Sequence, residues 1–256
     1  MRKTRNNDKD LLIELVRARF KLRYNNSILG FVWVLLKPFL SFLIMFFVFS
    51  ARAEGSDPDF AAKLFIGNIL FVFMQEGVVF GMNSLLDMAN ILLKINFPRQ
   101  IAILSSVVMA AVNFGINFIV IIIFTLALSY RPHLSGVAYF AFIVLIIFML
   151  EYGISLFMSI VMVRVRDMTH IVDLGFQLLM WGSGIFYSID DMKGTVGAIL
   201  HLNPMAILID AARKAFLKDQ IVNVQAVLLI FGITVVIVLL GQIYFNKKIR
   251  RVAEYF

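Results

Sequence analysis

Cysteine is absent from this 256-residue chain, so disulfide bonds and thiolate metal sites are excluded. Histidine occurs only at His133, His170 and His201, a spacing that matches no metal-ligand motif. The chain also lacks a G-x-x-x-x-G-K-[ST] phosphate loop, a serine nucleophile elbow and an H-E-x-x-H motif. We therefore expect no enzymatic activity and no cofactor in this chain. Any active transport must then draw its energy from an ion gradient or from another protein.

Charged residues are scarce as well, at 16%, whereas 61% of residues are hydrophobic and the mean hydropathy is +0.90. Soluble domains are closer to half apolar, because their surfaces meet water. The apolar residues form six runs close to or above the ~20 residues that cross a bilayer. These runs are Phe31–Ser50, Leu64–Leu86, Ile101–Tyr130, Val137–Val163, Met168–Ile189 and Val222–Phe245. The sequence predicts an all-α membrane protein with six transmembrane helices in one domain, residues 31–245.

The charged residues predict how these spans are oriented. With six spans, 17 of the 24 Lys and Arg residues fall on the side that holds both termini. Because cytoplasmic loops are enriched in Lys and Arg, both termini are expected to be cytoplasmic, in a multi-pass protein of the bacterial inner membrane. The net charge of +8 follows from this distribution beside anionic lipid, and a nucleic-acid partner is not expected. Residues 1–30 show no cleavable signal peptide, and residues 246–256 form a basic cytoplasmic tail.

The segment Asp8–Tyr24 has the pattern of an amphipathic helix. Its charged residues recur at helical spacing, whereas Leu11, Leu15 and Leu22 lie beside them. We expect a helix lying in the membrane interface. A helix packed on a partner protein is the alternative, and the two are compatible. The candidate interface residues are Asp10, Glu14, Arg17, Lys21, Arg23 and Tyr24.

The cytoplasmic loop Asp87–Gln100 contains a short apolar stretch before Pro98, which would end a helix there. A short apolar helix in a polar loop needs a surface to cover it, and a groove on a partner would serve. The alternative is a helix lying flat on the lipid. The candidate coupling residues are Asp87, Asn90, Ile91, Leu92, Lys94, Phe97 and Arg99.

The long external connection Ser188–Ile221 is too apolar for disorder. We expect it to form a re-entrant helical hairpin, with a membrane-surface helix as the alternative. Two acidic residues, Glu76 and Glu151, lie inside predicted spans, where they indicate either a polar transport path or hydrogen bonds and ion pairs between helices. Asn113 and Asn117 favour helix–helix contacts, and the Gly77–Gly81 GxxxG pair is weak support for close packing. The candidate channel or gate residues are Glu76, Glu151, Phe186, Tyr187, Ile199, Leu200, Asn203 and Pro204.

Five segments in order resemble a known family. From Leu11 the chain reads LLIELVRARFKLRYNNSILGFVWVLLKPFL, which resembles the K-x-R-Y-x-x-S-x-L-G-x-x-W-x-L-L-x-P start of ABC type-2 permeases for polysaccharides and polyol phosphates. The matching residues are Lys21, Arg23, Tyr24, Ser27, Leu29, Gly30, Trp33, Leu35, Leu36 and Pro38. NFPRQ, VRVRDM, GIFYSID and HLNPMAILIDAARKAFL follow in the family's order. The short acidic loop Ala51–Phe60 is a departure with no assigned role.

Within this family the sequence is most similar to Wzm-like permeases of O-antigen exporters. The resemblance implies a homodimer that works with two copies of a separate Wzt-like ABC ATPase, which binds ATP and Mg. It also implies a channel at the dimer interface for a polyprenyl-pyrophosphate-linked glycan. Capsule and teichoic-acid permeases share these motifs, so those substrates remain alternatives. A proton-coupled carrier using Glu76 and Glu151 is a further alternative, whereas a membrane transferase is disfavoured because the acidic residues are dispersed.

Overall fold

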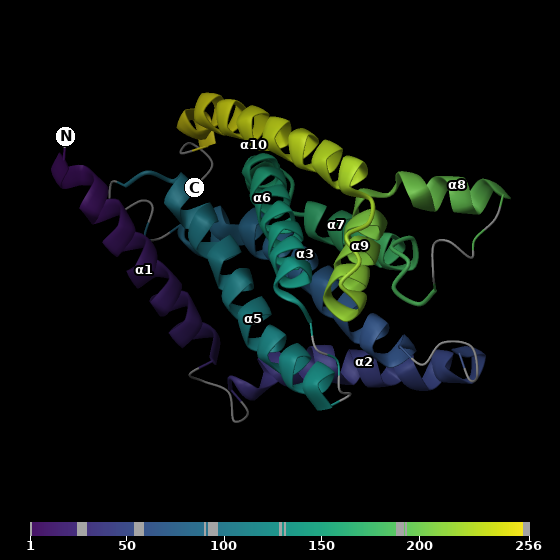
Figure 1. The fold of residues 1–256 in the computed structure, drawn as a ribbon. Helices are drawn as coiled ribbons and strands as arrows, with labels where there is room; N and C mark the ends of the chain where they lie inside the picture. The colour runs from purple at the N-terminus through teal and green to yellow at the C-terminus, as the bar shows by residue number, and fades with distance from the viewer. Residues whose placement is uncertain are drawn as a thin grey trace.

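The computed structural model describes residues 2–24, 30–53, 59–89, 91, 97–127, 130, 132–187, 192 and 194–252. Over these residues the regular structure is entirely helical, which confirms the all-α prediction. The helices are α1 (Arg2–Tyr24), α2 (Val32–Ala53), α3 (Phe60–Asp87), α5 (Gln100–Ala127), α6 (Leu134–Arg164), α7 (Met168–Trp181), α8 (Gly194–Leu202), α9 (Pro204–Lys218) and α10 (Val224–Val252). Figure 1 shows α1 beside α5 along one side of the bundle, while α8 projects from the opposite side.

Five of the described helices, α2, α3, α5, α6 and α10, are long and apolar enough to cross a membrane. Each overlaps one of the predicted spans. The predicted fifth span, Met168–Ile189, differs, because α7 ends at Trp181 after 14 residues. A helix of that length measures about 21 Å, against a hydrocarbon core of about 30 Å. The chain turns at Gly182–Gly184, where Gly184 has a φ of 64°. A sixth crossing, at the position predicted for the fifth span, therefore stays a prediction.

The long helices alternate in direction from α2 to α6. Ring contacts define the antiparallel neighbours: Phe42 meets Phe65 at 4.9 Å, Phe65 meets Phe124 at 5.4 Å, and Phe118 meets Phe140 at 5.3 Å. The phenylalanines that are abundant in the sequence thus fill the contacts between helices.

Helices α6 and α10 depart from this alternation, because they run parallel to each other. Tyr139, near the start of α6, donates a hydrogen bond to the carbonyl of Val222, just before α10. Near the other end of α6, Phe157 packs on Tyr244 with ring centroids 5.3 Å apart. Two parallel neighbours cannot be joined by a short turn. The segment α7–α9 therefore carries the chain back along the bundle, from the end of α6 to the end where α6 begins.

Most of α3 is buried, and two glycines let it approach α6 closely. A Cβ at Gly77 would overlap the carboxyl group of Glu151, and a Cβ at Gly81 would overlap the side chain of Ser155. The hydroxyl of Ser155 donates to the Gly77 carbonyl at 3.4 Å. The GxxxG pair therefore forms a close helix–helix contact in this fold.

Candidate functional site

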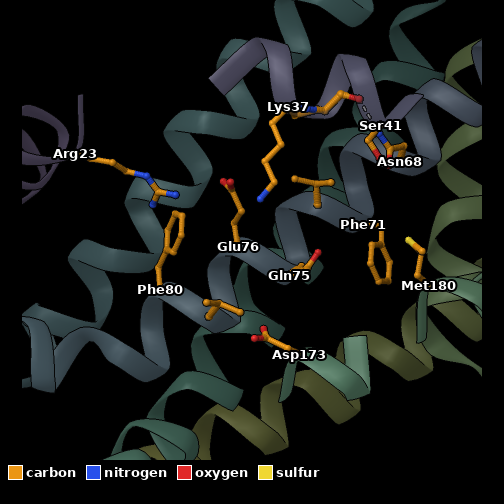
Figure 2. Close-up of a pocket in the computed structure, with 13 residues that line it drawn as sticks. Arg23, Lys37, Ser41, Asn68, Phe71, Gln75, Glu76, Phe80, Asp173 and Met180 are labelled. Atoms are coloured by element: carbon orange, nitrogen blue, oxygen red, sulfur yellow. Dashed lines mark hydrogen bonds between the residues drawn. The ribbon is translucent and has the colours of Figure 1, made fainter. Parts of the chain in front are cut away.

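A cavity of about 340 Å³ lies between α2, α3 and α7, beside the last turn of α1. Figure 2 shows its mixed lining, in which charged groups face aromatic and aliphatic ones. The lining residues are Arg23, Lys37, Pro38, Ser41, Asn68, Phe71, Val72, Gln75, Glu76, Val79, Phe80, Asp173 and Met180. Phenyl faces combined with amide, hydroxyl and carboxylate groups suit a ligand with alternating apolar and hydroxyl surfaces, such as a sugar.

The charges in this wall are balanced. Lys37 from α2 and Glu76 from α3 extend into the same space, while Asp173 of α7 lies on another side (Figure 2). The Arg23 guanidinium sits 4.1 Å from the centre of the Phe80 ring, which is cation–π geometry. The cavity therefore carries two cationic and two acidic side chains.

Two side-chain amides contact the proline turn of α2 beside this cavity. Proline has no N–H, so the Val34 carbonyl loses its usual partner within α2. Asn117 of α5 donates to that carbonyl at 3.2 Å, and Asn68 of α3 donates to the Pro38 carbonyl at 3.1 Å. In an apolar surrounding the freed carbonyl of Val34 needs a donor, which Asn117 supplies, whereas Asn68 gives the Pro38 carbonyl an additional contact. The two amides thus hold the proline turn of α2 against α3 and α5.

The two acidic candidates within the spans occupy different environments. Glu76 lines the cavity and accepts a hydrogen bond of 2.8 Å from Asn113. Glu151 is 0% exposed between α6 and α3, and neither of its oxygens has a hydrogen-bond partner among the described residues. An ionised carboxylate in that position would be strongly unfavourable. The structure therefore brings Glu76, but not Glu151, to the cavity.

Helix α1 begins earlier than predicted and packs on the bundle. Leu11, Leu12 and Leu15 contact the apolar cluster at the adjoining ends of α3 and α5. Asp10, Glu14, Arg17, Lys21 and Arg23 are exposed, and Arg17 pairs with Glu14 at 2.9 Å. The charged side thus stays uncovered, but so does Leu22, which is 78% exposed although the pattern puts it on the apolar side.

Two residues of α1 reach inward. Arg19 pairs with Asp87 at the end of α3, with a nitrogen–oxygen distance of 3.6 Å. Burial lowers the pKa of Arg19, and Asp87 opposes that shift. Tyr24 reaches Asn113 in the middle of α5, and burial raises its pKa. The end of α1 therefore lies deeper along the bundle than Arg19 does.

The coupling candidates are described only in part. Asn90, Leu92 and Lys94 lie outside the described residues. Ile91 is 39% exposed, whereas Phe97 packs on the apolar cluster that also holds Leu15. Arg99 donates to the carbonyl of Ile249 in α10 at 2.9 Å. Asp87 and Arg99 thus fix the ends of this loop to α1 and α10.

The gate candidates gather where α7, α8 and α9 meet. Phe186 is buried and stacks on Phe49 of α2 at 4.8 Å, while Tyr187 donates to the Trp181 carbonyl. Leu200 is 5% exposed and packs in a small cluster with Ala206. Ile199 lies on α8, with its side chain outside the described set.

Asn203 and Pro204 start helix α9. The Asn203 side chain caps the helix by accepting from the Met205 N–H at 3.0 Å, and it donates to the Gly182 carbonyl at 2.6 Å. Pro204 occupies the first turn, where a missing N–H is tolerated. One side chain thus connects the start of α9 to the end of α7.

Arg213 was not predicted as a site residue, yet it joins three elements. It is 7% exposed on α9 and donates to the carbonyls of Gly184 and Ile185 at 2.7 and 2.9 Å. A Cβ at Gly67 of α3 would overlap its guanidinium. The available signal was an arginine within the largely apolar stretch Met205–Leu217.

A second cluster that sequence reasoning missed lies at the ends of α3 and α9. Asp59 accepts a hydrogen bond from Tyr130 and pairs with Lys218 at 3.0 Å. These contacts, the tyrosine bond above all, lower the pKa of Asp59. Asp219 accepts from Ser135 and from the Gly136 N–H at the start of α6. Loops far apart in the sequence are thereby held together at this end of the bundle.

Comparison with known proteins places these features in a family. Residues 10–217 match the ABC-2 type transporter family. Two proteins named O-antigen export system permease protein RfbA from Klebsiella pneumoniae are 26% and 27% identical, over 96% of this chain and 94% of theirs. A protein of the same name from Myxococcus xanthus is 25% identical, over 95% of this chain and 94% of its own. The family match includes every residue that lines the cavity, most of α1 and nearly all of the α7–α9 segment, and the chain belongs to the ABC-2 type transporter family.

Proposed function

We propose that this protein is the permease subunit of an ATP-driven exporter that moves O-antigen polysaccharide across the bacterial inner membrane. The observation that carries this proposal is the near full-length similarity to permeases named for O-antigen export. The lining of the cavity, with Phe71 and Phe80 beside Gln75 and Glu76, is compatible with sugar rings. The proposed cargo is a polyprenyl-pyrophosphate-linked glycan delivered to the periplasm.

In this proposal two copies of the chain form the channel, and two copies of a separate ABC ATPase bind ATP and Mg. The chain crosses the membrane six times, with α7 and the residues after it making the fifth crossing. The parallel packing of α6 and α10 supports this count, because the chain between them must return across the bundle. Residues 1–30 and 246–256 are then both cytoplasmic, and they flank a single transmembrane domain in the sequence.

Orientation is open to a direct test, because the natural chain contains no cysteine. A cysteine introduced at Thr195 should react with a membrane-impermeant reagent applied from the periplasmic side. A cysteine at Ala253 should react only after the membrane is permeabilised. Labelling of Ala253→Cys from outside would contradict the six-crossing arrangement.

The proposed coupling elements are the segment Asp87–Arg99 and the charged side of α1. In the structure, Leu15 of α1 lies in the same apolar cluster as Met88 and Phe97, which are described residues of this segment. A force applied by an ATPase to either element would therefore reach the other. Channel and gate roles go to Glu76 in the cavity and to the α7–α9 region, where Phe186, Leu200 and Asn203 lie.

The decisive experiment deletes the gene for this protein in the native cell and measures where the glycan accumulates. Lipid-linked polysaccharide should accumulate on the cytoplasmic face and vanish from the surface, and the wild-type gene should restore export only with its ATPase partner. Glycan accumulation without loss of O-antigen would favour the capsule or teichoic-acid alternative. Proton flux through the purified chain in liposomes, abolished by Glu151→Gln, would favour the proton-coupled carrier instead.

A further inference from the structure

Three side chains from three helices form a continuous hydrogen-bond chain beside the cavity. The Tyr24 hydroxyl of α1 donates to the Asn113 side-chain oxygen of α5 at 3.2 Å. The Asn113 amide nitrogen then donates to the Glu76 carboxylate of α3 at 2.8 Å. Asn113 is buried, at 3% exposed, so water offers it little competition. These hydrogen bonds begin on α1, the helix proposed to receive force from the ATPase, and end on an acidic group of the cavity wall.

The chemistry of Asn113 suits this middle position. A carboxylate only accepts hydrogen bonds, and a tyrosine hydroxyl at this distance needs an acceptor. A side-chain amide supplies an acceptor oxygen and a donor nitrogen in one planar group. Reorienting the amide to follow one partner therefore moves its bond to the other.

The neighbouring amide, Asn117, holds the frame in which Asn113 acts. It lies one turn further along α5 and donates to the Asn113 carbonyl at 2.9 Å and to the Val34 carbonyl at 3.2 Å. Neither bond reaches Tyr24 or Glu76. A control must lie away from this frame, and Thr125 of α5 serves, because it is 1% exposed and its hydroxyl donates to the Ile121 carbonyl of its own helix at 2.8 Å.

The last turn of α1 also touches the cavity directly. Arg23, next to Tyr24, lines the cavity and lies over the Phe80 ring. Any displacement of this turn changes the cavity at two places, through Arg23 at its edge and through Asn113 at Glu76. Figure 2 shows Lys37 and Glu76 extending into the same space, so a Glu76 released from Asn113 has a cation to turn toward.

We propose that Asn113 is a positioning residue that transmits movement of the last turn of α1 to the Glu76 carboxylate. Glu76 either stays on Asn113, leaving the cavity open to the hydroxyl groups of a glycan, or turns toward Lys37 and narrows it. The coupling is reciprocal, so a sugar that binds Glu76 also biases the position of α1. This inference rests on the proposed function for the source of the movement and for the identity of the ligand.

The contact chain can be tested without ATPase or glycan. In the cysteine-free protein, Gln75→Cys places a single thiol in the cavity wall. Its reaction rate with a water-soluble thiol reagent is measured for the full chain in lipid nanodiscs. Tyr24→Phe and Asn113→Leu should each slow labelling by about fivefold, the factor expected from one net hydrogen bond. The double variant Tyr24→Phe/Asn113→Leu should label no more slowly than Asn113→Leu alone.

Thr125→Val is the control and should leave the rate within about twofold, even though it lowers the melting temperature. An equal effect of Thr125→Val, or an unchanged rate in Tyr24→Phe, would overturn the inference. If Asn113→Leu does not fold, Glu76→Gln replaces it. Tyr24→Phe should then have no further effect in that background, and a persisting effect refutes the contact chain. Loss of glycan export is scored separately, so failure of the proposed function is distinguishable from failure of this inference.

Discussion

Replacing Arg213 by methionine should destabilise the protein more than any other single change in α9 that keeps side-chain length. The guanidinium donates to two backbone carbonyls, of Gly184 and Ile185, in the turn that follows α7. Methionine has a similar reach but donates no hydrogen bond. Both carbonyls would lose a charged donor in a buried location.

The size of the effect follows from these two contacts. Hydrogen bonds to charged groups contribute about 1.5–3 kcal/mol each, so losing two should lower stability by about 3 kcal/mol or more. For a chain of this size, each kcal/mol corresponds to about 2–4 °C in melting temperature. The expected loss for Arg213→Met is therefore about 6–12 °C. The melting temperature of Arg213→Lys should lie between those of the wild type and Arg213→Met, because an ammonium group lacks the planar fork that reaches both carbonyls.

The assay heats the detergent-solubilised protein and measures, at each temperature, the fraction that remains monodisperse. Lys214→Met is the matched control on the same helix. Lys214 pairs with Asp210 at 2.8 Å, an i,i+4 contact between partly exposed side chains that is worth about 0.3–0.5 kcal/mol. Its melting temperature should fall by about 2 °C or less. If the two variants unfold within about 2 °C of each other, Arg213 does not hold the α7–α9 turn.

Three further outcomes are expected. Leu200→Ala should raise ion leakage through the protein in liposomes without ATP, because it empties a buried position in the region proposed as the gate; an ion-tight variant with normal export would exclude a gate there. Tyr130→Phe should lower thermal stability, because its hydrogen bond keeps the pKa of Asp59 below the ordinary value. A carboxyl pKa that is lowered in the folded state stabilises the fold at pH values above the unfolded pKa of about 4. The difference in thermal stability between wild type and variant should therefore narrow as the pH falls below about 4. A constant difference from pH 3 to 7 would contradict this. Ile91→Cys should form a cross-link to a cysteine on the co-expressed ATPase, and labelling only by lipid-soluble reagents would place that segment on the membrane instead.

The long helices could be predicted because apolar runs of sufficient length have few other stable arrangements. The sides of α1 could be predicted for a related reason, since Asp10, Glu14, Arg17 and Lys21 recur at helical spacing and the structure leaves all four exposed. Helix α7 is shorter than the apolar run that predicted the fifth span. Hydropathy extends the fifth run to Ile189, but Gly182 and Gly184 permit the turn that ends the helix near Trp181.

The contacts of the candidate site were less accessible to sequence reasoning. Asn113 was expected to join helices, yet its partners come from α1 and α3, which periodicity does not relate to each other. Arg213 was not singled out, because nothing in the sequence places it over Gly67. Such pairings depend on which helices become neighbours and on their register, both of which are set by packing across the whole bundle.

The parallel arrangement of α6 and α10 also fixes an order of events during biosynthesis. Gly153 of α6 lies against Ile237 and Val238 of α10, a contact that forms only once α10 is in place. For it to form, α7, α8 and α9 must carry the chain back along the bundle, since they connect the two partners. A nascent chain arrested ahead of Val224 would therefore hold α6 with one side bare to lipid.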